Sequence, residues 1–134
     1  MASITKHIPI AADADRVWKA LRDVANPHVV FAPVLTGTEL DGDDRVVTFA
    51  NGLVARERIV DLDDHRRRLA YTVVDGPFSH HHATFTVTGG RSWSTVTWVT
   101  DLLPDEMAPI VDGLMDEGAA ALAASLGSES RAAR

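Results

Sequence analysis

The stretch PDEMAPIVDGLMDEGAAALAASL, residues 104–126, decides the fold of this chain. It begins with Pro104, Asp105 and Glu106, and acidic side chains just after a proline are typical of a helix N-terminus, where they meet the positive end of the helix dipole. The expected helix carries apolar side chains on or near one side, at Met107, Val111, Leu114 and Met115. That side must be buried against something else in the molecule.

The preceding region, residues 34–103, predicts short strands joined by turns. A single helix that follows a run of antiparallel strands has to bury its apolar side against the sheet. The sheet must then curve around the helix, and this arrangement tends to enclose a cavity. A cavity of that kind suits a small, mostly apolar molecule.

Seven strands are predicted from alternating apolar residues and turn signals, at 3–10, 35–40, 45–50, 53–62, 68–74, 81–88 and 94–102. Asn51-Gly52 is a strong hairpin signal, and Pro9 suits an edge strand or a strand end. An apolar stripe at i, i+3 and i+4 predicts a helix that starts after Asp13 or Asp15 and runs to about residue 22. A second, one-turn helix is expected within residues 28–33.

This order predicts an α+β helix-grip fold. A seven-stranded antiparallel sheet curves around the long C-terminal helix, and two short helices follow the first strand. We expect one ligand-binding domain over residues 1–126, followed by a disordered polar tail at 127–134. No internal repeat or linker indicates a second domain.

Composition excludes several classes of function. The 134 residues include no cysteine, which removes disulfides, thiolate metal sites and cysteine nucleophiles. The net charge of −6 argues against a duplex nucleic acid or an anionic membrane surface as partner. No apolar run reaches the roughly 20 residues of a membrane-spanning helix. The first residues lack a signal-peptide core, so we expect a cytoplasmic protein without stable membrane insertion.

Several segments together carry a family resemblance. They are IPIAA at 8–12, DRVWKAL at 15–21, GLVARERIVDLD at 52–63, LAYTV at 69–73 and STVTW at 94–98. In this order and spacing the chain resembles the START-like, or SRPBCC, superfamily, and specifically its polyketide cyclase/dehydrase branch. No single segment is specific, and the combination covers residues 3–126.

The resemblance implies a protein that binds a lipid, a polyketide or a related hydrophobic metabolite between the sheet and the C-terminal helix. The alternative is an aromatase/cyclase-type enzyme that acts on a ligand in the same cavity. A third possibility is an interaction domain that uses the convex face of the sheet. The family has no universal catalytic triad to transfer, and no cofactor is implied. The resemblance is compatible with a monomer or a homodimer.

Three residues are candidates for acid–base chemistry. Strand alternation places Glu57 on the apolar, concave face, where a carboxylate is costly unless it is paired. The alternative role for Glu57 is a structural acid bonded to a tyrosine, a tryptophan or a backbone amide. Tyr71 could orient a ligand or act as an ordinary core tyrosine. His81 could face the cavity mouth or lie in solvent at the strand start.

The residues expected to contact a ligand are largely aromatic or apolar, with Glu57 and Tyr71 as polar members: Phe31, Phe49, Glu57, Tyr71, Phe85, Trp98, Met107, Val111 and Met115. Phe31 falls in the loop where a lid over the entrance is expected. Gly113 and Gly118 weaken the long helix, either to permit its close approach to the sheet or simply to lower rigidity.

The run His80-His81-His82 does not predict a metal site. Neighbouring strand residues point to opposite faces, so only His80 and His82 share one, and zinc requires three or four ligands. The run Arg66-Arg67-Arg68 is expected to be a solvated turn.

Overall fold

The computed structural model describes residues 1–132, with side chains described through Gly127. All the expected strands are present: β1 (Ala2–Ile10), β2 (Leu35–Asp41), β3 (Asp44–Phe49), β4 (Val54–Asp63), β5 (Arg68–Val73), β6 (His80–Gly89) and β7 (Ser94–Leu103). They form one antiparallel sheet in the order β1-β7-β6-β5-β4-β3-β2. Pro9 lies in β1 at the edge of the sheet, where a missing backbone donor is tolerated.

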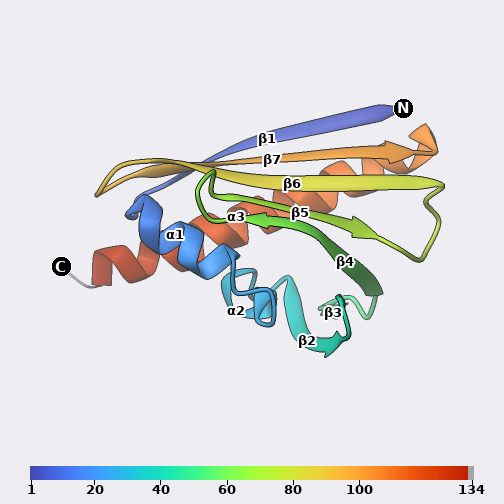
Figure 1. The fold of residues 1–134 in the computed structure, drawn as a ribbon, viewed down its shortest axis with the longest axis horizontal. Coiled ribbons are helices and arrows are strands. Elements are labelled where there is room, and N and C mark those ends of the chain that lie inside the picture. Colours follow the sequence, from blue (N-terminus) through green and yellow to red (C-terminus); the bar gives the residue numbers. More distant parts are fainter. Residues whose placement is uncertain (133–134) are drawn as a thin grey trace.

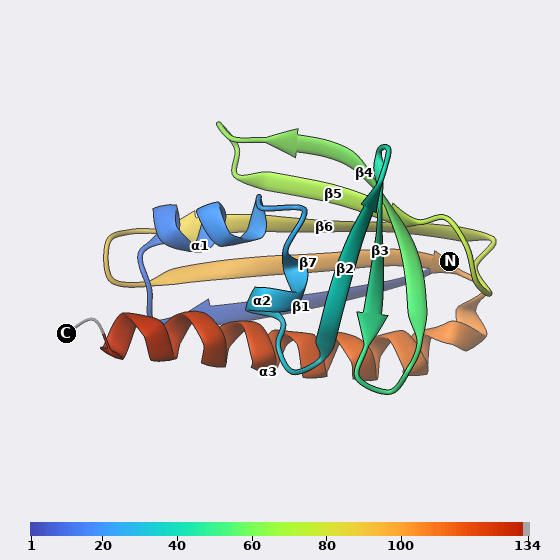
Figure 2. The ribbon, with the colours of Figure 1, turned by 90° about the horizontal axis from the view of Figure 1, so that it is seen from below.

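The sheet is strongly bent. Strands β1, β7 and β6 lie nearly flat, whereas β4, β3 and β2 turn out of their plane toward the side that α3 occupies (Figure 1, Figure 2). The pairing of β4 with β5 slips by one residue between Ile59 and Asp61. The extra residue, Val60, is 54% exposed. Such a bulge sharpens the bend of a strand and shifts its alternation, so that Ile59 and Leu62 both pack against the core.

Two short helices follow β1, as predicted. Helix α1 (Ala14–Leu21) is capped by the Asp13 side chain, which accepts a hydrogen bond from the Asp15 backbone N–H. Helix α2 (Pro27–Val30) is a single turn that begins at a proline. The last helix, α3 (Ala108–Ala132), runs along the whole sheet (Figure 2). Among the described residues, no helix is long and apolar enough to cross a membrane.

Both ends of the long helix differ from the prediction. Pro104 precedes a separate 3₁₀ turn, η1 (Asp105–Met107), and the α-helix begins only at Ala108. The reason is Pro109, which has no backbone N–H and must lie in the first helical turn. At the other end the helix does not stop near residue 126. It continues through Ala132, into the predicted disordered tail, since no proline in residues 127–132 interrupts its backbone hydrogen bonds. Residues 133–134 lie outside the described part.

Helix α3 is held against the sheet by an ion-pair cluster and by one close contact. The Nζ atom of Lys6 in β1 lies 2.7 Å from Oδ1 of Asp112 and 2.8 Å from Oδ1 of Asp116 in α3. Further along, Gly118 packs directly on Trp98 of β7. A Cβ atom at Gly118 would lie 3.0 Å from the Trp98 ring, whereas one at Gly113 would meet nothing within 4 Å. Close approach therefore explains Gly118 but does not explain Gly113.

This difference predicts different effects for the same substitution at the two glycines. Gly118→Val should lower the free energy of unfolding by about 1–3 kcal/mol, because the added methyl groups overpack the Trp98 ring. Gly113→Val is the matched control, and its effect should be near zero or slightly stabilising, because valine is the better helix former. Urea unfolding of both variants measures the difference. Equal effects would show that the contact with Trp98 does not limit the helix position.

Candidate ligand-binding cavity

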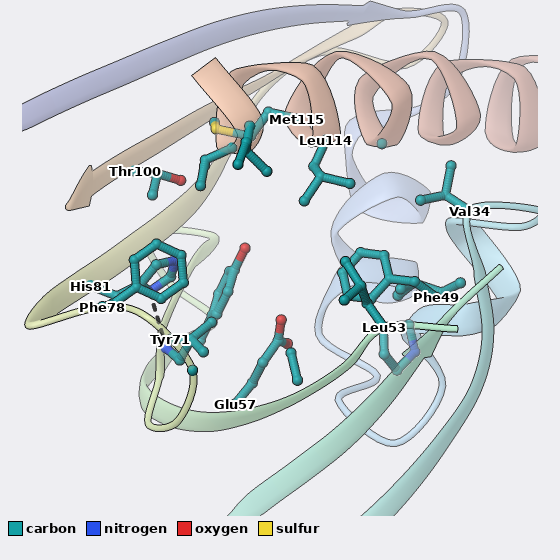
Figure 3. A pocket seen from close by; sticks show the side chains of 18 of the residues that line it. Val34, Phe49, Leu53, Glu57, Tyr71, Phe78, His81, Thr100, Leu114 and Met115 are labelled. Carbon is teal, nitrogen blue, oxygen red and sulfur yellow. Dashed lines mark hydrogen bonds between the residues drawn. The ribbon is translucent and has the colours of Figure 1, made fainter. Parts of the chain in front are cut away.

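A cavity of about 400 Å³ lies between α3 and the concave face of the sheet (Figure 3). Its walls are mainly apolar and aromatic side chains from β3 to β7, the α2 region and the first half of α3. All the residues predicted to contact a ligand line it: Phe31, Phe49, Glu57, Tyr71, Phe85, Trp98, Met107, Val111 and Met115. The cavity is thus where the sequence pattern placed it, and ligand contact by these residues stays a prediction.

The mouth of the cavity is marked by lining residues that are also exposed. Leu53 and Val54, after the β3–β4 turn, are 54% and 56% exposed, and Ile110 in the first turn of α3 is 57% exposed. Gly76 and Pro77, in the β5–β6 loop, are exposed and also line the cavity. An entrance bounded by two loops and a helix start leaves the buried aromatic residues of the lining at the inner end.

Phe31 is not a lid residue. It follows α2 as its C-terminal cap and is only 7% exposed. Its ring centroid lies 5.8 Å from Phe85 and 5.9 Å from Trp98, so it forms part of the inner wall. The expected one-turn helix is present, but it buries Pro27 and Val30 and so carries Phe31 into the core and away from the cavity entrance.

Tyr71 lies at the polar end of an aromatic cluster. Its ring stacks on Phe85, whose ring stacks on Trp98. The Trp98 indole N–H donates to the Tyr71 hydroxyl oxygen at 3.3 Å. Burial, reinforced by the negative charge of Glu57, raises the pKa of Tyr71, so the phenol keeps its proton. With its oxygen accepting from Trp98, the hydroxyl can donate into the cavity, toward which it points (Figure 3).

Glu57 is buried on the concave face, and its partner is Arg45 of β3. The Arg45 Nε donates to Glu57 Oε1 at 2.8 Å, and the two side chains are only 5% and 12% exposed. Arg45 also donates to the Val24 carbonyl, and its guanidinium lies 5.6 Å from the centroid of the Tyr71 ring. Glu57 is therefore held by an arginine, and not by the tyrosine, tryptophan or backbone amide expected of a structural acid.

Sequence reasoning missed Arg45, although a signal was present. In β3 the residues Arg45, Val47 and Phe49 alternate onto one face, and Val47 and Phe49 are apolar. The same parity that placed Phe49 in the cavity therefore placed Arg45 there. In the sheet Arg45 lies directly opposite Glu57, which brings the two charges together.

His81 lines the cavity and is half-buried, which corrects the view of it as a solvated residue at a strand start. Its Nδ1 accepts a hydrogen bond from the Val73 backbone N–H at 3.0 Å, so the proton of the neutral ring is on Nε2. Phe78 and Tyr71 pack on the ring at 5.0 Å and 5.9 Å. Burial, with smaller effects of His80 and His82, lowers the pKa of His81 to about 4.

Comparison with known protein families shows to which family this chain belongs. Residues 1–127 match the family described as polyketide cyclase / dehydrase and lipid transport. The chain belongs to this family. The match confirms the resemblance seen in the sequence and extends over nearly the whole chain. No curated protein matches the chain in sequence.

Solved structures with the same fold include an uncharacterized protein, an aromatase/cyclase and a START superfamily protein. An uncharacterized protein from Bacillus thuringiensis has a TM-score of 0.83 and 22% identity, over 93% of this chain and 98% of the other. The Zhui aromatase/cyclase from Streptomyces sp. R1128 has a TM-score of 0.75 and 21% identity, over 99% of this chain and 96% of the other. A START superfamily protein from Mycobacterium smegmatis has a TM-score of 0.74 and 15% identity, over 98% of this chain and 99% of the other. These likenesses confirm the helix-grip fold predicted for the chain.

The polar groups of this family member allow only limited chemistry. Tyr71 keeps its proton, and His81 uses Nδ1 to accept from the backbone, so neither is arranged as a general base. Glu57 is the remaining candidate, through the carboxylate oxygen that does not contact Arg45. Within the described residues, no cluster of three or more His, Asp or Glu side chains could hold a metal ion.

The pKa of His81 predicts a loss of stability in mild acid. Its folded-state pKa of about 4 lies below the ordinary 6.5, so its contribution is complete above pH 6.5 and is lost as the pH falls toward 4. Between pH 7 and pH 5 the free energy of unfolding should fall by about 1 kcal/mol. This is less than the full difference between the two pKa values would give, because the ring is partly exposed.

The control is His81→Asn, whose side-chain oxygen can still accept from Val73 but does not titrate. Urea unfolding at pH 7 and pH 5 should show a pH dependence that is smaller by about 1 kcal/mol in this variant. An unchanged dependence, or an NMR titration of His81 near pH 6.5, would contradict the buried, neutral ring.

Proposed function

We propose that this protein binds a small, mostly apolar molecule, such as a lipid, a polyketide or a related metabolite, in the cavity between the sheet and α3. The observation that carries the proposal is the cavity itself, of about 400 Å³, with apolar walls and a few convergent polar groups. Ligand sites commonly have this size and composition. Two methionines in the lining, Met107 of η1 and Met115 of α3, can adapt to ligands of different shape.

The first test is native mass spectrometry of freshly purified protein, followed by denaturing analysis of any released molecule. We expect an apolar molecule bound in stoichiometric amount. Where the protein is empty, we expect it to bind the uncharged dye Nile red with a dissociation constant in the micromolar range, which corresponds to a binding free energy of about −8 kcal/mol. A protein that carries no passenger and binds no uncharged probe would overturn the proposal.

The second candidate is an aromatase/cyclase-type enzyme, which Glu57 supports because its carboxylate points into the same cavity (Figure 3). A shaped cavity that holds a flexible poly-carbonyl chain can raise the rate by limiting its competing conformations. One neighbour of the same fold is an aromatase/cyclase. Retained substrate binding with lost turnover in Glu57→Gln would support this candidate, and unchanged turnover would exclude Glu57 as the base.

The interaction-domain alternative is less well supported by the contacts of the convex face. Arg58 and Arg56, which alternate with Glu57 along β4 and so lie on the convex face, donate to Asp44 at 2.8 Å and 3.1 Å. These arginines hold the pKa of Asp44 below its usual value. Because their charges are already paired within the domain, they offer a weaker attraction to an acidic partner.

A further inference from the structure

The proposed function leaves open what kind of polar group the ligand carries, and the charges of the cavity bear on that question. Three charged side chains line the cavity among the described residues, namely Arg45, Glu57 and Asp75. Asp75 is exposed in the β5–β6 loop, where its carboxylate accepts from the Arg56 backbone N–H. The inner end therefore contains one cation and one anion, which form a pair.

Arg45 is already engaged on several sides. Its Nε donates to Glu57 at 2.8 Å, its Nη1 donates to the Val24 carbonyl at 3.3 Å, and one face of the guanidinium is over Tyr71. The side chain is 5% exposed. An anionic ligand would thus have to compete with Glu57 for a cation that is already neutralised.

Glu57 and Tyr71, by contrast, retain hydrogen-bonding capacity toward the cavity. Among the described residues, no donor contacts the second carboxylate oxygen of Glu57, and no acceptor contacts the Tyr71 hydroxyl proton. Both groups point into the cavity (Figure 3). His81 adds an Nε2–H that has no protein partner in the same part of the chain. The inner end can therefore serve a ligand carbonyl and a ligand hydroxyl.

We infer that the cavity selects uncharged ligands whose polar end is a carbonyl or a hydroxyl, and that Glu57 excludes carboxylates with the same apolar body. A ligand carboxylate would meet the Glu57 charge in a mostly apolar cavity whose one lining cation among the described residues, Arg45, is already paired, and an unpaired buried charge is strongly disfavoured. A carbonyl accepts from Tyr71, and a hydroxyl donates to Glu57, without any charge being buried. This inference rests on the proposed function, because it concerns the same cavity.

The test compares three probes that share one apolar body: 2-acetylnaphthalene, 2-naphthol and 2-naphthoate, which is anionic at pH 7. Fluorescence or calorimetric titration of the wild-type protein should give dissociation constants at least about tenfold lower for the two uncharged probes. Glu57→Gln keeps the shape but leaves the Arg45 charge unopposed, so it should shift the ratio toward naphthoate by about tenfold or more. The shift should be absent in Glu39→Gln, which removes the same charge at an exposed position in β2.

The outcomes separate the two proposals. Binding of naphthoate as tight as that of the uncharged probes, or an unchanged ratio in Glu57→Gln, would overturn this inference and leave the proposed function intact. Binding of none of the three probes would instead count against the proposed function.

A second variant keeps the test valid where Glu57→Gln does not fold, which circular dichroism would reveal. Tyr71→Phe should weaken the binding of 2-acetylnaphthalene several-fold, which corresponds to the loss of about one neutral hydrogen bond, and should leave the binding of 2-naphthol, whose hydroxyl donates to Glu57, unchanged. Equal weakening of both probes by Tyr71→Phe would overturn the role assigned to the hydroxyl.

Discussion

Replacement of Arg45 by methionine should lower the free energy of unfolding by about 3–5 kcal/mol, the largest effect expected of any single change considered for this chain. The Nε of Arg45 and the Oε1 of Glu57 are 2.8 Å apart, and both side chains are almost completely buried. Methionine fills much of the same space but carries no charge. The carboxylate of Glu57 would then stay in a largely buried site without its cation, and this desolvation cost dominates the loss.

Two control variants isolate that cause. The double variant Arg45→Met with Glu57→Leu removes both charges, so most of the stability should return, because apolar pairs of similar volume often replace buried ion pairs at little cost. Arg56→Met breaks ion pairs with Asp44 and Asp41 on the convex face, where Arg56 is 36% exposed, and should cost about 1 kcal/mol or less.

Urea unfolding at pH 7 measures all three variants. A loss in Arg45→Met no larger than that in Arg56→Met would contradict the picture of a desolvated pair at the inner end of the cavity. A double variant as unstable as Arg45→Met would show that the loss comes from packing and not from the unpaired charge.

Leu114→Trp should reduce the affinity for an uncharged apolar probe by about tenfold to a hundredfold. Leu114 projects from α3 into the cavity, and the indole would occupy part of a space of about 400 Å³ that the ligand needs (Figure 3). The domain should remain folded, because the ring enters existing space and does not displace close-packed side chains.

The matched control for this prediction is Ala120→Trp, on the same helix at an exposed position outside the cavity lining. It should bind the probe like the wild-type protein. Nile red titration and a thermal unfolding midpoint, recorded for both variants, separate a blocked cavity from a damaged fold. Wild-type affinity in Leu114→Trp would show that the ligand binds elsewhere.

The sequence was sufficient for the architecture and for the faces of the strands. Alternation along β4 assigned Glu57 to the concave face, and the same reasoning assigned Phe49, Phe85 and Trp98. A period of two specifies which side of the sheet a residue occupies, and a long apolar helix after hairpin-length connections leaves few ways to bury it. These signals are local, so they can be recognised without knowledge of the partners.

The partners themselves were decided by the tertiary structure. Arg45 meets Glu57 only through the register of the β3–β4 hairpin, and Val60 shifts the alternation of β4 through a bulge. Phe31 enters the core because α2 buries this segment. His81 stays neutral because Val73 donates a backbone hydrogen bond to it and Phe78 and Tyr71 pack on its imidazole.

The two glycines of α3 illustrate the same division. In the sequence Gly113 and Gly118 are equivalent, since each weakens a helix by the same amount. Only the packing of α3 on β7 separates them, with Trp98 in contact with Gly118 and open space at Gly113. The sequence by itself determined the helix-grip fold and the apolar cavity, because periodicity and chain order act locally. Register, bulge position and helix contact depend on the whole assembled sheet, and they decided which charges and hydrogen bonds the cavity contains.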